Sequence, residues 1–422
     1  MDLSQPRGIR DIEPDEHETH EKIRHTFEEV ARAYNFRAME PGPLENLATL
    51  RAKSGTQVDE QIYNFRDKAG REIGLRFDLT VGMTRYVAKK KDLKLPVKLA
   101  SYGGVWRYDE PQHARYRWFY QWDVEIFGDS TTEADAEVMD LSYKLFEKVG
   151  VGDFILRIGD RRVVEEYIRK KLKVSSEDKV LEMMRAIDKV AKKAEPDLVK
   201  EYEEKGVGRE ELTDLLKFGR IRGAPAAVLA KLEEHGLESV IGLSELGDSL
   251  KLRGLKRVEY DLSIVRGIDY YTGLVFEISD VAHPDLGSLC GGGRYDVLPK
   301  IFGRTDLAAT GAAGGVERIA LSLSEKKAAQ TNSVYVAFTE PALFGDAMKV
   351  LASLRDQGTR SDIGQRGKAL GKQLEDASSR GFRWTVIVGK RELAAGTVVL
   401  RDMRDRKEER VPLNEIAGRL LG

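Results

Sequence analysis

The sequence predicts a mixed α/β protein of two or three domains, because 422 residues exceed the usual size of one domain. Three observations predict this class. From Ser101 to Gly128, apolar and aromatic residues alternate on both sides of a polar loop, which indicates two strands. Residues 331–422 alternate between strand and helix patterns, as in a small α/β domain. Near the N-terminus, apolar residues recur at the spacing of an amphipathic helix: Ile23, Phe27, Val30, Ala31 and Tyr34.

Composition excludes several classes of protein. With 41% hydrophobic and 33% charged residues, the chain can bury a core and remain in water. It has no apolar run of about 18 residues, and MDLSQPRGIRD has no apolar signal core, so we expect a cytoplasmic protein without a membrane span. The single cysteine, Cys290, excludes an intrachain disulfide and a cysteine-cluster metal site. The net charge is −1, so a nucleic acid would have to meet a local basic patch.

The strand pair carries charges among its apolar residues. Charged side chains that point inward from a sheet are costly unless something pairs with them. An anionic ligand such as a nucleotide could be that partner, and a plain hairpin with its charges in solvent fits the bare pattern as well. The charges stand at Arg107, Asp109, Glu110, Arg115, Arg117, Asp123 and Glu125.

The segments around the strand pair have simpler patterns. Glycine and two prolines predict an extended lead-in over residues 1–15, and Tyr63 to Leu75 has the pattern of a hairpin. Asp78 and Thr80 stand at a strand end, where an acid and a threonine can orient an ammonium group. Either residue could instead cap a helix that begins near Val81. A helix is predicted over 131–149 and a buried strand over 154–158.

Residues 161–250 differ from the rest of the chain. They are rich in lysine and glutamate, have helical apolar spacing and contain no catalytic constellation. This composition predicts an inserted helical domain. A solvated helical excursion without a ligand fits the same pattern.

Polar and small residues concentrate again after the insertion. YDLSIVRGIDYYTGLVFEI, from Tyr260, has the pattern of a strand, a polar turn and a strand. GSLCGGGRYDVL, from Gly287, has three successive glycines that let a backbone approach a ligand closely. GAAGGVERIAL, from Gly311, leads from a strand of small residues into a helix that carries Glu317 and Arg318.

Taken in this order, the segments resemble the motifs of the histidyl-tRNA synthetases, a family of class II aminoacyl-tRNA synthetases. RYRWFYQWDVEIFG resembles motif 2, the segments from Tyr260 and Gly287 resemble the histidine-A and histidine-B motifs, and the segment from Gly311 resembles motif 3. The opening QPRGIRD resembles the KGTRD-type opening of the family. Many members have glutamate where Asp78 stands, and the aspartate form is similar to the archaeal and eukaryotic branch.

The resemblance implies an α/β (α+β) fold with an antiparallel-sheet catalytic core flanked by helices. It implies a core at 1–160 and 251–325, a helical insertion at 161–250 and an anticodon-binding domain at 331–422. It also implies a homodimer that forms through the motif 1 segment around Pro41. Residues 331–422 contain 16 Lys+Arg and 12 Asp+Glu, a charge of +4, against −5 for the remainder, which suits RNA contact.

The resemblance also implies site residues. Arg107 and Arg266 would be catalytic, Gln112 would face the acceptor end of tRNA, and ATP would bind with Mg²⁺ as a substrate. It implies neither a tightly bound cofactor nor a metal site of the protein's own. The family positions that hold ATP match Arg107, Asp109, Arg115, Tyr116 and Arg318. Those that hold histidine match Asp78, Leu79, Thr80, Arg107, Gln121, Glu125, Arg266, Tyr270 and Tyr271.

The implied function is ATP-dependent attachment of L-histidine to tRNA(His) through a histidyl-adenylate. The alternative is the regulatory paralogue of ATP phosphoribosyltransferase, which senses histidine without catalysis. That paralogue lacks the C-terminal domain and has lost ATP-binding arginines. This chain keeps both the C-terminal domain and the arginines. A second alternative is a class II amide ligase with no RNA partner, against which the C-terminal domain also argues.

Overall fold

The computed structural model describes residues 3–52, 59–110, 114–190, 193–265, 270–324 and 333–421. The chain divides into two compact units, residues 1–325 and 326–422. No helix among the described residues is long and apolar enough to cross a membrane.

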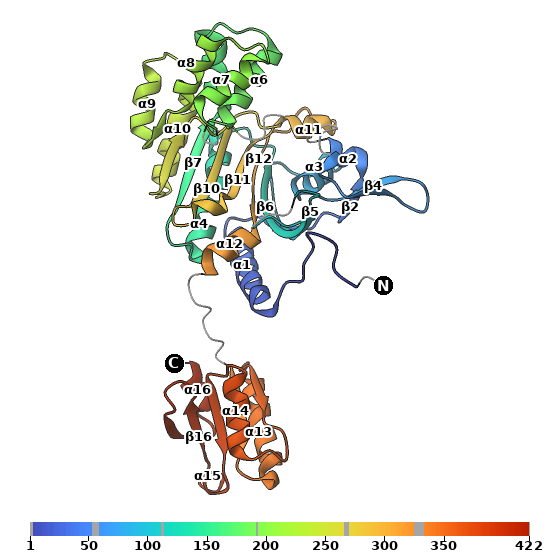
Figure 1. The fold of residues 1–422 in the computed structure, drawn as a ribbon, viewed down its shortest axis with the longest axis vertical. Helices are drawn as coiled ribbons and strands as arrows, with labels where there is room; N and C mark the ends of the chain where they lie inside the picture. Colours follow the sequence, from blue (N-terminus) through green and yellow to red (C-terminus); the bar gives the residue numbers. More distant parts are fainter. Residues whose placement is uncertain are drawn as a thin grey trace. The chain divides into compact units, whose positions relative to one another are not determined.

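A nine-stranded sheet forms the centre of the first unit (Figure 1). Its neighbouring strands run antiparallel except at two places, where β1 lies parallel to β5 and β7 lies parallel to β9. The predicted antiparallel core is therefore confirmed. In spatial order the strands are β1 (Arg37–Ala38), β5 (Val97–Trp106), β6 (Trp118–Phe127), β12 (Ala309–Gly315), β11 (Ser288–Arg294), β10 (Leu274–Asp280), β7 (Phe154–Asp160), β9 (Val258–Asp261) and β8 (Arg222–Gly223).

Side-chain alternation along β6 gives the sheet two different faces. Trp122 is fully buried, and its ring lies 5.6 Å from that of Phe27 on α1 (Pro14–Ala33). The helix α4 (Thr132–Val149) packs against β6, β10, β11 and β12, and α12 (Val316–Ser324) packs against β6 and α1. Gln121 and Glu125 alternate with Trp122 and face the other way, into a cavity.

A smaller sheet of three strands, in the order β2-β4-β3, follows the first helix in sequence. The predicted hairpin from Tyr63 to Leu75 is confirmed, and Gly70 in its turn has φ +78°, a conformation that favours glycine. The elements of this region are β2 (Leu44–Asn46), α2 (Leu47–Arg51), β3 (Asn64–Arg66), β4 (Glu72–Leu75) and α3 (Thr80–Lys89).

Helices occupy most of the segment between β7 and β9, as the apolar spacing predicts. Their buried faces are lined mainly by leucine, isoleucine, valine and methionine, and they join the main core of the first unit. The elements are α5 (Arg161–Glu166), η2 (Tyr167–Lys171), α6 (Glu177–Asp188), α7 (Glu195–Glu203), α8 (Arg209–Gly219), α9 (Pro225–Glu233) and α10 (Val240–Leu252).

The two strands predicted before and after the polar turn of the Tyr260 segment both form, but they do not pair with each other. The strand β7 lies between them, antiparallel to β10 and parallel to β9. The sequence pattern is local and cannot show that a strand more than a hundred residues earlier takes the central place. Two short elements complete the first unit, η3 (Pro284–Leu286) and α11 (Val297–Ile301).

The second unit has a five-stranded sheet in the order β14-β13-β15-β16-β17. The predicted alternation of strands and helices is confirmed. Strand β13 pairs in parallel with β14 and β15, whereas the pairs β15–β16 and β16–β17 are antiparallel. The elements are β13 (Val334–Phe338), η4 (Pro341–Leu343), α13 (Phe344–Asp356), β14 (Ser361–Ile363), α14 (Leu370–Ser379), β15 (Trp384–Val388), α15 (Lys390–Ala394), β16 (Thr397–Asp402), β17 (Glu408–Pro412) and α16 (Ile416–Leu421).

Candidate functional site

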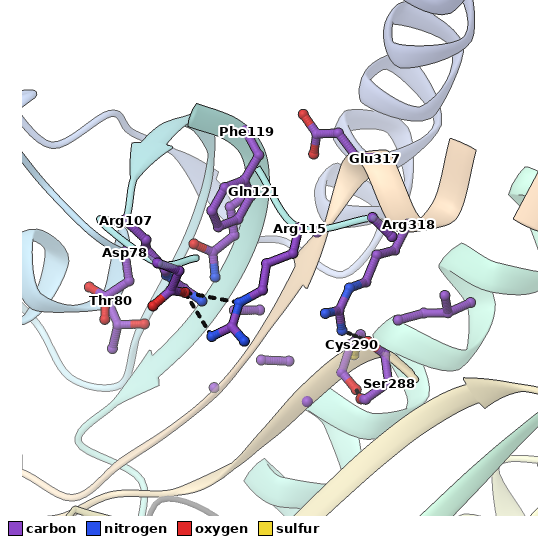
Figure 2. Close-up of a pocket in the computed structure, with 18 of the residues that line it drawn as sticks. Asp78, Thr80, Arg107, Arg115, Phe119, Gln121, Ser288, Cys290, Glu317 and Arg318 are labelled. Carbon is purple, nitrogen blue, oxygen red and sulfur yellow. Dashed lines mark hydrogen bonds and ion pairs between the residues drawn. The ribbon is translucent and has the colours of Figure 1, made fainter. Parts of the chain in front are cut away.

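A cavity of about 710 Å³ opens on the face of the nine-stranded sheet that is opposite α4. Strands β6, β11 and β12 form its floor, and the segments around Asp78, Arg115 and Tyr270 form its walls (Figure 2). Its size is that of a small-molecule site. Eleven predicted site residues line it: Asp78, Thr80, Arg107, Asp109, Arg115, Tyr116, Gln121, Glu125, Tyr270, Tyr271 and Arg318.

Glu125 lies at the closed end of this cavity, where its side chain is almost fully buried. Its carboxylate accepts a hydrogen bond of 2.5 Å from the hydroxyl of Tyr295. Burial and the neighbouring carboxylate raise the pKa of Tyr295 well above its usual value, so this hydroxyl stays protonated and donates. The pair holds the Glu125 carboxylate in one place without any ligand.

Gly311 faces Glu125 across the paired strands β12 and β6. A Cβ at this position would lie 1.5 Å from Oε2 of Glu125, so any side chain larger than hydrogen would displace the carboxylate. In the motif 3 strand, this glycine therefore makes room for a protein carboxylate.

Asp78, Thr80 and Gln121 add further polar side chains to the lining of the cavity. Asp78 accepts a hydrogen bond of 3.0 Å from the backbone N–H of Val81, so it does cap α3 while it also lines the cavity. Thr80 donates to the buried Asp123 at 3.2 Å. The buried Oε1 of Gln121 has no hydrogen-bond partner among the described residues, which leaves an acceptor for a ligand.

Three further predicted histidine-binding residues have different places. The side chain of Leu79 is fully buried in the apolar core and does not line the cavity. Tyr270 and Tyr271 both line it, with ring centroids 4.2 Å apart, and the carbonyl of Tyr271 accepts a hydrogen bond from Arg161. Arg266 and the predicted tRNA contact Gln112 lie outside the described residues.

Three arginines line the open end of the cavity, where Figure 2 shows Arg107 nearest Asp78, Arg318 nearest Ser288, and Arg115 between them. Arg107 donates to the carbonyl of Phe77 at 2.9 Å, and its guanidinium lies 5.1 Å from the ring centroid of Phe119. Arg115 donates twice to one carboxylate oxygen of Asp109, at 2.8 and 3.1 Å. Arg318 donates to the carbonyl of Ser288 at 2.9 Å.

Glu317 precedes Arg318 on α12 and is buried at the edge of the cavity. One of its oxygens accepts a hydrogen bond of 2.9 Å from the backbone N–H of Tyr120, and the other has no partner among the described residues. Burial raises its pKa to about 7, so near neutral pH it is only partly ionised.

The lining carries both carboxylates and guanidinium groups, which suits a polar organic ligand. The described residues contain no group of histidine, cysteine, aspartate and glutamate that could hold a metal ion. Fixed guanidinium groups at the open end can stabilise negative charge on phosphate, whereas the buried carboxylate at the closed end can accept a hydrogen bond from a ligand N–H.

Tyr295 and Gly311 are not among the site residues that the sequence predicts. Both stand inside the histidine-B and motif 3 segments, but nothing local in the sequence shows that their strands meet at Glu125. Arg294 was missed as well: it pairs with the buried Asp135 at 3.0 Å and donates to the carbonyls of Asp129 and Thr131, each at 3.0 Å. These bonds fix the end of β11 directly before Tyr295.

The antiparallel sheet and its cavity have the form that the resemblance to class II aminoacyl-tRNA synthetases implies. Comparison with known families gives the particular one: residues 8–319 match the histidyl-tRNA synthetase family, and residues 333–422 match the anticodon binding domain family. The chain belongs to the histidyl-tRNA synthetase family.

Similar proteins agree with this assignment. A histidine–tRNA ligase of Pyrococcus horikoshii is 34% identical over 99% of this chain and 98% of its own length. One from Thermococcus kodakarensis is 35% identical over 97% of this chain and 96% of its own. The crystal structure of a histidyl-tRNA synthetase from Nostoc has a TM-score of 0.87 and 27% identity, over 100% of this chain and 99% of that one. Both relatives are archaeal, which agrees with the expected similarity to the archaeal and eukaryotic branch.

Proposed function

We propose that this cavity is the active site in which the chain, a histidine–tRNA ligase, joins histidine to the AMP part of ATP, releasing pyrophosphate, and then transfers the histidyl group to tRNA(His). One observation carries the proposal. A buried carboxylate, held by a tyrosine hydroxyl, lies at the closed end of a cavity whose open end is surrounded by arginines. The first group suits an imidazole ring, and the second suits the phosphates of a nucleotide.

Histidine is recognised through its ring. One ring nitrogen donates to the carboxylate of Glu125, and the other accepts from the hydroxyl of Tyr271, with Tyr270 beside it. A site that is built to satisfy both nitrogens leaves buried polar groups unpaired when another amino acid enters, and this cost gives strong discrimination.

The ammonium group of histidine is held by Asp78, Thr80 and Gln121. The unpartnered oxygen of Gln121 supports this role, because an ammonium group offers three N–H donors. With the ring and the ammonium both fixed, the carboxylate of histidine is directed toward the open end of the cavity.

The carboxylate then attacks the α-phosphorus of ATP, and the bond to pyrophosphate breaks. Arg107 and Arg266 stabilise the charge that develops on the α-phosphate oxygens, because fixed guanidinium groups stabilise charge better than mobile water does. Asp109, Arg115, Tyr116 and Arg318 bind the rest of ATP, and Mg²⁺ that arrives with ATP neutralises charge on its β- and γ-phosphates.

In the second step, a hydroxyl of the terminal ribose of tRNA attacks the carbonyl carbon of the adenylate, and AMP leaves. The loop from Glu110 to Arg115, with Gln112, faces the acceptor end of the RNA. The second unit binds the anticodon, and the insertion at 161–250 contacts the acceptor stem. The enzyme acts as a cytoplasmic homodimer that forms through the segment around Pro41.

The test is ATP–pyrophosphate exchange, scanned over the twenty amino acids with the full chain. Exchange with L-histidine alone is the expected result. Binding of histidine without any exchange would indicate a histidine-sensing protein instead. Exchange without subsequent transfer to tRNA would indicate a ligase with another acceptor.

A further inference from the structure

The opening segment, residues 7–16, contacts both ends of the loop that joins β5 to β6. Arg7 pairs with Glu110 at 2.9 Å at the start of this loop. At its end, the backbone N–H of Arg117 donates to the carbonyl of Gly8 at 2.9 Å, and the side chain of Arg117 donates to the carbonyl of Arg7 at 3.2 Å. The opening segment is therefore hydrogen-bonded to the described residues on both sides of 111–113.

These contacts do not contribute equally. The side chains of Arg7 and Glu110 are 75% and 71% exposed. Solvent screens this ion pair, so it contributes little to the attachment of the segment to the loop. Arg117 is buried, and its two bonds to the opening segment have little access to water. The attachment at the end of the loop, next to Tyr116, is the firmer one.

Arg10 adds a contact with Tyr116 itself. Its guanidinium lies 4.1 Å from the centroid of the Tyr116 ring, and its two terminal nitrogens form a forked pair with Glu16 at the start of α1. Both side chains are less than a third exposed, and their pairing raises the pKa of Arg10 and lowers that of Glu16. Arg10 is thus charged, is fixed by Glu16, and lies over the ring of Tyr116.

Tyr116 lines the cavity, whereas Arg10, which contacts the Tyr116 ring, is not among the described lining residues. The charge of Arg10 also acts on Glu317, a second lining residue. The opening segment therefore adjoins the cavity through Tyr116, a residue assigned above to ATP.

We propose that residues 7–16 are a positioning strap for the ATP site, in which Arg10 fixes the Tyr116 ring against which the nucleotide binds. The inference rests on the proposed function, since it assigns Tyr116 to ATP. Arg10 is a positioning residue, because it acts through Tyr116.

The test is ATP–pyrophosphate exchange with the full-length variant Arg10→Met, which keeps an unbranched apolar stem and removes the guanidinium. We expect the KM for ATP to rise roughly tenfold while the KM for histidine stays within about twofold. A side chain that merely stabilises the fold would change both constants or neither.

Arg24→Met is the matched control. Arg24 also pairs with a glutamate, Glu28 at 2.9 Å, and its guanidinium lies 5.6 Å from the ring centroid of Tyr102. Tyr102 is not among the described residues that line the cavity. We expect Arg24→Met to leave both KM values unchanged.

Two further variants keep the proposal open to contradiction if Arg10→Met folds poorly. Arg10→Lys keeps the charge but loses the flat face, and we expect an intermediate KM for ATP. In a Tyr116→Leu background, Arg10→Met should add little, because the ring through which Arg10 acts is gone.

Full additivity of the two changes would overturn the proposal, as would equal effects of Arg10→Met and Arg24→Met. A wild-type protein with no exchange at all would instead contradict the proposed function.

Discussion

The two ends of the cavity are built differently. At the closed end, Glu125 and Tyr295 are 1% and 2% exposed and are hydrogen-bonded to each other inside the sheet. At the open end, the Arg115 side chain is 48% exposed and pairs with Asp109 from the same loop. Arg107 and Arg318 donate to backbone carbonyls there.

The difference shows which half of the site is complete before a substrate arrives. A buried hydrogen-bonded carboxylate cannot easily move, so the closed end selects its ligand by an existing arrangement. A half-exposed ion pair contributes only about 0–1 kcal/mol, so a phosphate can readily replace Asp109 as the partner of Arg115. If the two ends bind histidine and ATP as proposed, specificity for histidine is built into the sheet, whereas Arg115 is free to exchange Asp109 for a phosphate of ATP.

The largest expected effect is that of Glu125→Ala, which removes the acceptor at the closed end. We expect kcat/KM for histidine to fall on the order of 10³-fold or more, because the ring nitrogen of histidine would be left without a partner. The KM for ATP should change far less. Exchange kinetics with each substrate varied in turn measure both constants, and equal effects on the two would contradict the division of the cavity.

Arg107→Lys should have the next largest effect, and at the other end of the cavity. A lysine ammonium lacks the planar fork of arginine, so we expect kcat for adenylate formation to fall on the order of 10²–10³-fold. Arg266→Ala should cost a similar factor. Arg71→Lys, in an exposed turn, is the control and should leave the rate unchanged. An effect of Arg107→Lys on the KM for histidine alone would show that Arg107 does not act at the open end of the cavity.

Gly311→Ala tests whether the absence of a side chain on β12 at this position keeps the Glu125 carboxylate in place at the closed end. The added methyl group would lie 1.5 Å from Glu125 Oε2, so the carboxylate must move away from Tyr295. Overpacking of this kind costs about 1–3 kcal/mol, so kcat/KM for histidine should fall by roughly 10- to 100-fold. Gly345→Ala, where a Cβ would meet no atom within 4 Å, is the control. Normal histidine kinetics in Gly311→Ala would show that Glu125 is not held as described.

The smallest effect is on stability and depends on pH. Burial raises the pKa of Glu317 from 4.5 to about 7, so the folded state carries a penalty that is absent below pH 4.5, grows up to about pH 7 and is constant above it. Glu317→Gln keeps an acceptor for the Tyr120 N–H and should raise stability at pH 8 by up to about 3 kcal/mol. Melting temperatures at pH 5 and pH 8 measure this difference. A gain that is equal at both pH values would contradict the raised pKa.

The sequence predicts the individual strands and helices of the site, but not which of them lie next to each other. The strands on both sides of the motif 2 loop, the helix after Asp78 and the strand–helix step at Glu317 all follow from local alternation, capping and small-residue patterns. The hydrogen bond between Glu125 and Tyr295 joins residues 170 positions apart, and it depends on β12 lying between β6 and β11. Strand order of that kind is set by tertiary packing and leaves no local signal.

The same limit explains the other differences. The segment around Tyr260 has the composition of a hairpin, but β7 separates its two strands, because β7 pairs with both. Leu79 lies between two cavity residues in sequence, yet its side chain points into the core, since α3 begins at the next residue and turns successive side chains to different sides.

Calorimetric titration of the free protein with L-histidine, without ATP, tests the central claim most directly. If the closed end is complete in advance, histidine binds with a Kd close to its KM in exchange, and Glu125→Ala abolishes this binding. If histidine binds only after ATP has been added, the closed end is not preformed, and the contrast between the two ends of the cavity is wrong.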